Sequence, residues 1–434
     1  MDALRENQML ATVDGLRDDL VETLRSLVAT NTVNPYSGED AGGSEAEGQH
    51  LLQDHLARLG ARTRLFEPAP DTFEKAGVIG PKDRSWIGRP NLVGEWDFGT
   101  GSGPSIIVMG HIDTVGVQGM NDPFGAGIRD GRMHGRGTTD CKGGLVSALG
   151  AIEALLPLAE DLNGHLIFLS VVDEECNGSG AGAIACIDEG IHADTAISVD
   201  GSPEQILRGC GGVITAGIKV HGQAGHGSIG NGVSAIEMGI LIAQTIRKFG
   251  DARHSAFADC LLNIGTFSGG THPAVIAGEA EITLNIVYHI TEASRANEET
   301  GRWGGDLVWN DLVKAVRTTE DKDPWLADHP SDIGWIKDLV PYEIPVDSPV
   351  IRGMAKAAAD VKGQPVPVGK MKAWTDACWF PVLGNIPISV YGPGDHGLAH
   401  GPHESLDLDD LMFVTKVLSL HLYRTLLRES AEAY

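Results

Sequence analysis

The stretch Ile-Ile-Val-Met-Gly-His-Ile-Asp-Thr-Val, residues 106–115, places a short apolar run directly before a histidine and an aspartate. Two further apolar runs are also followed by acidic residues. The run 166–172 precedes Asp-Glu-Glu at 173–175, and the run 195–199 precedes Asp200. Short, continuous apolar runs of this kind predict strands that are buried on both faces. A helical pattern between the first two runs adds the alternation typical of α/β layering.

These patterns predict an α/β fold with a mainly parallel sheet covered by helices. Between residues 211 and 344 the order changes to strand, helix, strand and strand, which predicts an inserted α+β domain. The flanking segments, 1–210 and 345–434, then form one discontinuous domain. We found no internal repeat.

Composition and charge indicate which binding partners and which cellular location to expect. The 434 residues carry 59 acidic and 33 basic side chains, a formal net charge of -26, so nucleic acid and anionic membrane surfaces are not expected partners. No basic leader with an apolar stretch begins the chain, and no membrane span is expected, so we predict a cytoplasmic protein. The six cysteines have no Cys-x-x-Cys spacing, which argues against a disulfide framework or a cysteine zinc site.

The polar residues after the strands predict one site. Carboxyl ends of strands meet at one edge of an open α/β sheet, where ligands bind. A glycine-rich segment at 135–144 adds Asp140, and the loop after the run 386–391 adds several histidines. Each signal alone is ordinary, since an aspartate often caps a helix and a His-x-Asp is often a turn. Together they indicate a histidine and carboxylate centre suited to zinc, cobalt or manganese.

The motifs at 110–115, 135–144, 173–175, Asp200 and 399–404 together resemble the metal-dependent acylase and exopeptidase family. That family includes acetylornithine deacetylase, succinyl-diaminopimelate desuccinylase, aminoacylase and glutamate carboxypeptidase. The resemblance runs in order along nearly the whole chain. It implies a zinc-exopeptidase-like catalytic domain and an inserted lid and dimerisation domain.

The resemblance also implies the ligands of two divalent metal ions, zinc by expectation, with cobalt or manganese as alternatives. Asp140 would bridge the ions and precede a cis peptide bond. His111 and Asp200 would hold one ion, and Glu175 and His400 the other. His396 and His403 are interpreted as loop residues.

Three further residues are assigned roles. Asp113, two positions after His111, can accept the second ring N–H and fix the tautomer. Glu174 is the general base, which takes a proton from the attacking water and delivers it to the leaving amine. His226, in the insert, resembles the family's lid histidine, which would stabilise the oxyanion in the partner subunit's site and implies a homodimer.

The chain departs from the family where a substrate carboxylate is usually held. Ala274 stands near the expected asparagine, and residues 285–287 contain no arginine. Lys370, Lys372 or Arg352 are candidate substitutes. The leading hypothesis is an amidohydrolase that cleaves an N-acyl amino acid or a related small amide, including one that lacks the usual carboxylate. A metallo-dipeptidase or carboxypeptidase is the alternative, and a non-catalytic binding protein is a remote one.

Overall fold

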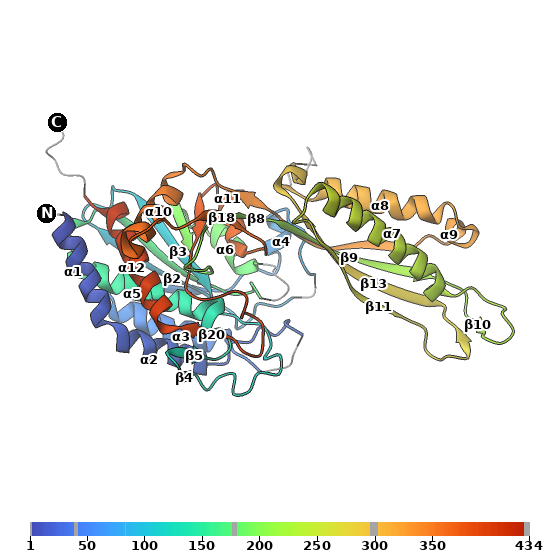
Figure 1. Cartoon of the computed structure of the whole chain (residues 1–434), viewed down its shortest axis with the longest axis horizontal. Coiled ribbons are helices and arrows are strands. Elements are labelled where there is room, and N and C mark those ends of the chain that lie inside the picture. Colours follow the sequence, from blue (N-terminus) through green and yellow to red (C-terminus); the bar gives the residue numbers. More distant parts are fainter. Residues whose placement is uncertain (1, 39–41, 83, 176–179, 296–302, 429–434) are drawn as a thin grey trace.

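The structure, a computed structural model of the chain, describes residues 2–38, 42–82, 84–175, 180–295 and 303–428. Two separate clusters of buried apolar side chains divide these residues into two units. The larger unit takes chain from both ends of the sequence, and the smaller extends from it as an arm (Figure 1). The α/β class predicted from the strand and helix patterns is confirmed.

The larger unit is built on one sheet with strand order β1-β2-β6-β3-β7-β19-β8-β17, and β18 also pairs with β8. Its strands are β1 (Arg62–Phe66), β2 (Asn91–Phe98), β3 (Ser105–His111), β6 (Gly164–Val171), β7 (Thr195–Ser198), β8 (Ile206–Cys210), β17 (Tyr342–Glu343), β18 (Val368–Met371) and β19 (Ile388–Val390). A small sheet beside it contains β4 (Gly127–Arg129), β5 (Arg132–His134) and β20 (Ser405–Asp407).

Strand direction is mixed, which corrects the prediction of a mainly parallel sheet. The central strands β6, β3, β7 and β19 are parallel. Towards the edges, β1, β2, β8 and β17 are joined by antiparallel pairings. An apolar run reports that a strand is buried but carries no information about its direction.

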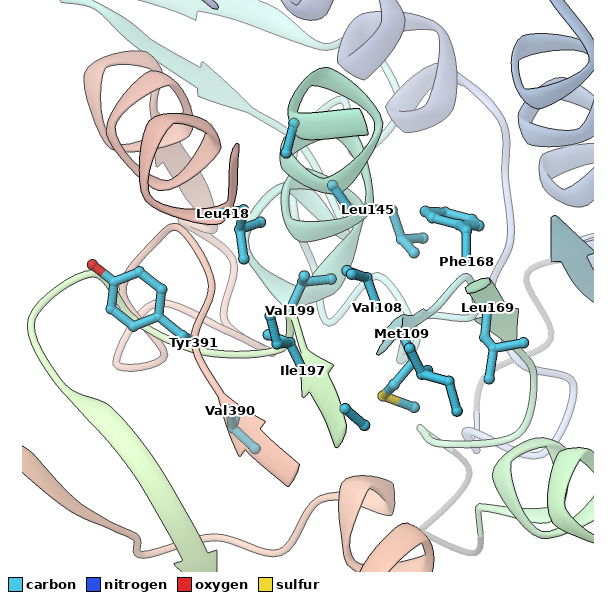
Figure 2. Close-up of a cluster of buried hydrophobic side chains, with 14 of the residues drawn as sticks. Val108, Met109, Leu145, Phe168, Leu169, Ile197, Val199, Val390, Tyr391 and Leu418 are labelled. Carbon is cyan, nitrogen blue, oxygen red and sulfur yellow. The ribbon is translucent and has the colours of Figure 1, made fainter. Parts of the chain in front are cut away.

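Helices cover the sheet, and α5 lies at the centre of the core. The helices of this unit are α1 (Asp2–Gly15), α2 (Arg17–Ala29), α3 (Glu45–Arg58), α4 (Thr72–Lys75), α5 (Gly143–Leu155), α6 (Ala181–Asp188), α10 (Pro349–Lys362), α11 (Trp379–Val382) and α12 (Leu408–Leu426). Short turns are η1 (Thr138–Lys142), η2 (Leu156–Asp161) and η4 (Asp376–Cys378). Figure 2 shows Leu145 of α5 and Leu418 of α12 gathered with buried side chains of the central strands.

The run Thr138–Asp161, which contains α5, has the length and hydropathy of a membrane span. However, 83% of its apolar window is buried inside the protein. Burial on all sides explains the composition, because a helix that is apolar all round is typical of the interior of a large domain.

The insert is a four-stranded antiparallel sheet, β11-β13-β9-β16, with helices on one face (Figure 1). Its elements are β9 (Gly212–His221), β10 (Gly225–His226), α7 (Ala235–Ala256), β11 (Leu262–Gly269), β12 (Val275–Ile276), β13 (Glu279–Tyr288), η3 (Ile290–Glu292), β14 (Ser294–Arg295), β15 (Trp303–Gly304), α8 (Asp306–Glu320), α9 (Pro324–Asp328) and β16 (Asp332–Leu339). Alternate residues of β9 and β13 are buried under α7 and α8, so one face of the sheet forms the second core.

The chain enters and leaves the insert at neighbouring points. Only Gly211 separates β8 from β9. On the return, Tyr342 already pairs with Cys210 in the large sheet, and Ile344 packs in the first core. The second crossing therefore comes just after β16, a few residues before the predicted boundary at 344.

Candidate active site

The predicted site residues lie where the central strands end. His111 is the last residue of β3, Glu174 and Glu175 follow β6, and Asp200 follows β7. These strands are neighbours in the parallel centre of the sheet. His400 comes from the loop after β19. Parallel pairing therefore brings four separate chain segments to one edge.

Asp140 reaches the same edge from η1, the turn that starts α5. The peptide bond between Asp140 and Cys141 is cis, as the family resemblance implies. Glu404 supports this turn, because its carboxylate accepts a hydrogen bond from the Thr139 N–H at 3.1 Å. Glu404 is itself fully buried and ion-paired with Arg136. A buried ion pair thus supports the turn that carries Asp140.

Asp140 stands between two sets of potential ligands. Its Oδ1 lies 3.0 Å from His111 Nε2, and its Oδ2 lies 3.2 Å from His400 Nε2. His400 Nε2 is also 3.0 Å from Glu175 Oε2. One potential ligand group contains His111, Asp140 and Asp200, and the other contains Asp140, Glu175 and His400. Within each group the ligand atoms lie within 4.8 Å of one another, and Asp140 is the shared member.

The donor set fits two divalent cations. Asp200 Oδ1 and Glu175 Oε1 are buried and have no hydrogen-bond partner among the described residues. A buried carboxylate oxygen without a donor is costly unless a cation or a proton is nearby. The neighbouring Cys141 belongs to neither ligand group, and its buried thiol donates to the main-chain oxygen of His111 at 3.2 Å. Histidine and carboxylate donors alone suit zinc, cobalt or manganese.

The pKa values of the site residues reflect the close approach of several buried carboxylates. Burial, with the repulsion of Asp140 next, raises the pKa of Glu175 to about 7. Hydrogen bonds to Asp140 and Glu175 raise the pKa of His400 to about 11. Burial raises the pKa of Glu174 well above its usual range, and the Glu175 carboxylate adds to that effect. Negative charge is therefore in excess, which favours a bound cation.

Asp113 differs from its predicted role. The ring Nδ1 of His111 contacts the main-chain oxygen of Asp113 at 3.0 Å, whereas the Asp113 carboxylate is 3.7 Å away. That carboxylate accepts hydrogen bonds from Asn34 Nδ2 at 2.8 Å and from the main-chain N–H groups of Glu174 and Glu175 at 3.3 and 3.0 Å. The backbone carbonyl therefore contacts the histidine ring, and the side chain holds the turn that carries the two glutamates.

Sequence reasoning missed two residues beside Asp200. His396, interpreted as a loop residue, has its Nε2 3.4 Å from Asp200 Oδ1. Asp376 is buried, and neither of its oxygens has a hydrogen-bond partner among the described residues. Its neighbour Thr375 donates to Asp200 Oδ2 at 3.3 Å. Asp376 shortly follows strand β18, so a search after every strand, including weakly apolar ones, would have found it.

A cavity of about 450 Å³ opens beside the cluster, between the two units. Its described lining is Tyr36, Ser37, Gly38, Val115, Glu174, Glu175, Val213, Asn285, Lys337, Leu339, Trp374 and His400. Asn285 and Lys337 both pair with Thr215, so they project from the same face of the insert sheet. Lys337 is the lysine of this lining, and the predicted substitutes Lys370, Lys372 and Arg352 are not part of it.

His226 lies elsewhere. It is exposed in β10, which pairs with β12 at the end of the insert farthest from the larger unit (Figure 1). Its Nδ1 accepts a hydrogen bond from the Ser228 N–H at 3.2 Å. The structure of the single chain therefore does not bring His226 to the cluster, and its action on a partner's site remains a prediction.

Two ligand sets that share one aspartate, beside a buried glutamate and a cavity, define the class of dinuclear metal-dependent hydrolases. The family model of "Peptidase family M20/M25/M40" matches residues 107–424, and the chain belongs to this family. The protein is therefore a metal-dependent hydrolase of amide bonds, which confirms the resemblance and sets aside the non-catalytic alternative.

Known relatives cover nearly all of the chain. The N-formyl-4-amino-5-aminomethyl-2-methylpyrimidine deformylase of Halalkalibacterium halodurans is 28% identical, over 96% of this chain and 96% of that protein. An acetylornithine deacetylase of Yersinia pseudotuberculosis is 27% identical, over 89% of this chain and 92% of its own length. A dinuclear metal-binding peptidase of Bacillus subtilis has the same fold, with a TM-score of 0.60 and 16% identity, over 95% of this chain and 100% of that one.

Proposed function

We propose that the protein hydrolyses the amide of a short N-acyl group on a small, flat amine that carries no α-carboxylate. The observation that carries this proposal is the cavity beside Glu174, which Tyr36 and Trp374 line and whose described lining contains no arginine. Aromatic side chains favour flat apolar groups, whereas a guanidinium is the usual partner of a carboxylate. The N-formyl aminomethylpyrimidine for which one relative is named has this chemistry.

The site residues would share the reaction as follows. Two divalent ions, zinc in this proposal and cobalt or manganese as alternatives, would be held by His111, Asp140, Glu175, Asp200 and His400 and would supply a polarised, acidified water. Glu174 takes the proton from the attacking water and delivers it to the amine nitrogen as the C–N bond breaks. The Asp113 carboxylate accepts a hydrogen bond from the main-chain N–H of Glu174 and so keeps Glu174 oriented towards the attacking water.

A substrate panel tests this proposal. The N-formyl aminomethylpyrimidine is expected to have a kcat/KM at least about 10-fold above those of N-acetylornithine and of dipeptides, since a described lining without an arginine gains less from a substrate carboxylate. The readout is the released amine for each compound under identical metal loading. A preference for the acetylated amino acid or for a dipeptide would overturn the assignment of the amine.

Lys337 favours a second candidate, a metallo-dipeptidase or carboxypeptidase, because this lysine lines the cavity from the insert. Lys337→Met separates the two. If a substrate carboxylate binds there, this variant raises KM for dipeptides while leaving KM for the uncharged formyl amide unchanged. Under the leading proposal, by contrast, the wild-type protein has a higher kcat/KM for the formyl amide than for dipeptides.

The insert supports a homodimer. Exposed apolar side chains lie on α7 and β11, and β11 is an edge strand of the four-stranded sheet. They are Ile236, Ile240, Leu241 and Phe267. An unpaired edge beside an apolar patch is a typical surface for pairing with a second copy. In the proposed dimer, each insert presents His226 to the partner's site as an oxyanion donor.

Subunit mixing tests the dimer. His226→Ala and Glu174→Ala are each expected to be nearly inactive, but a mixed dimer contains one site with Glu174 intact in the His226→Ala subunit and His226 supplied by its partner. Activity should return after subunit exchange, to about half the wild-type sites per mixed dimer if the sites are independent. Exchange confirmed by mass without any return of activity, or an active monomer, would contradict action across the interface.

A further inference from the structure

A buried ion cluster lies directly behind the two glutamates of the site. Arg89, two residues before β2, donates to Glu45 Oε1 at 2.8 Å and to Asp173 Oδ1 at 3.3 Å through the same Nη2 atom, and its Nε also bonds Glu45. The side chains are 8%, 1% and 0% exposed for Arg89, Glu45 and Asp173. None of the three belongs to either group of potential metal ligands.

Asp173 has an unusual backbone conformation. Its φ is +71°, in the left-handed region that residues other than glycine rarely adopt. Such a conformation persists only where the surroundings hold it. Asp173 is tied at two points, because its carboxylate bonds Arg89 and its main-chain oxygen accepts from the Gly180 N–H at 2.8 Å.

This turn sets the directions of the next two residues. Glu175 approaches His400, whereas Glu174 lines the cavity where the substrate binds. From one side, Asp113 accepts from the main-chain N–H groups of both glutamates. From the other side, Arg89 holds the residue just before them. Arg89 also faces the ring of Tyr36, which lines the same cavity, with 5.5 Å between its guanidinium carbon and the ring centre.

We propose that Arg89 is a positioning residue for the hydrolysis: with Glu45 as its counter-ion, it holds Asp173 in the left-handed turn that aims Glu174 at the attacking water. The inference rests on the proposed role of Glu174 as the base. A lysine does not replace Arg89, because its ammonium offers a single nitrogen, whereas Arg89 holds Glu45 through both Nε and Nη2 while Nη2 also contacts Asp173.

Two substitutions at Asp173 test the conformational part. Asp173→Gly and Asp173→Ala both remove the carboxylate, but only glycine adopts a positive φ freely. The proposal predicts that Asp173→Gly retains at least about 10-fold more kcat than Asp173→Ala, with two metal ions per chain and KM nearly unchanged in both. Equal kcat values for the two variants would overturn it.

A second experiment substitutes Arg89, and its result can be interpreted even if Asp173→Ala does not fold. Arg89→Lys is expected to lower kcat about 10- to 100-fold with metal content and KM retained, and adding Asp173→Gly is expected to restore most of that loss. A purely structural role would lower the melting temperature without this rescue. Arg253→Met, which breaks the partly buried pair with Glu292 in the insert, is the matched control and should leave kcat unchanged.

The outcomes distinguish the inference from the function on which it rests. Wild-type kcat in Arg89→Lys, or a loss of kcat that follows loss of metal, would overturn the positioning role while Glu174 variants stay inactive. If Glu174 variants themselves keep normal turnover, the proposed base is wrong, whatever the Arg89 variants do.

Discussion

Glu174→Gln is expected to lower kcat by about 10²- to 10⁴-fold, the range for removing a general acid and base. That loss corresponds to about 3 to 5 kcal/mol of activation free energy. Glu174 is only 8% exposed and lines the cavity, but it stands outside both potential ligand groups. The amide has nearly the same shape as the carboxylate and cannot take a proton from water. Steady-state kinetics on the best substrate of the panel measures the effect.

The same preparation needs two controls. Metal content and the melting temperature should match the wild type, since neither depends on the base. Glu160→Gln, at an exposed glutamate outside the site, should keep full activity. Turnover within about 3-fold of the wild type in metal-loaded Glu174→Gln, well short of the range for losing a general base, would show that another group moves the proton.

Much of the site could be predicted because it follows from one rule of sheet geometry. His111, Glu175 and Asp200 come from distant parts of the chain, but each ends a buried strand, and neighbouring parallel strands end at the same edge. Histidine and carboxylate side chains gathered at one edge then indicate a site for divalent metal ions. No knowledge of side-chain conformation was needed for this step.

The residues that orient these groups could not be predicted in the same way. The spacing of His111 and Asp113 placed them together, but whether the carboxylate or the main-chain oxygen meets the ring depends on backbone angles. Arg89 reaches Asp173 only because β2 lies beside β6 in the folded sheet, and its sequence surroundings give no sign of this. Contacts of this kind belong to the tertiary structure.

The fold shows a similar division. Apolar runs and helical periodicity located the central strands β3, β6, β7 and β19 and the insert elements β9, α7, β11 and β13, but strands β2 and β16 were not predicted. The antiparallel edges were missed because burial does not encode direction. Helix α8 was also missed. Its segment is polar overall, and the narrow stripe Val308, Leu312 and Val316 packs into the second core with Trp309 beside it. The stripe indicates a helix only when it is known that this segment covers one face of the insert sheet.

Loss of the shared ligand should have an effect at least as large as loss of the base. Asp140→Ala is expected to lose both ions and nearly all activity, because the two oxygens of Asp140 face His111 and His400, one in each ligand group. His400→Ala should lose one ion and lower kcat severely. His403→Ala, at an exposed histidine in the same loop, is the matched control and should keep both ions and full activity.

Metal counting combined with reconstitution tests whether two metal ions are required for hydrolysis. The wild-type protein is stripped by a chelator, its residual metal is measured by mass spectrometry, and zinc or cobalt is then added stepwise while hydrolysis and circular dichroism are recorded. We expect an inactive but folded apoprotein whose activity returns as about two ions bind per chain, since the ligands lie at the strand ends and loops of an already formed sheet. Full activity in a preparation verified to be free of metal would contradict it.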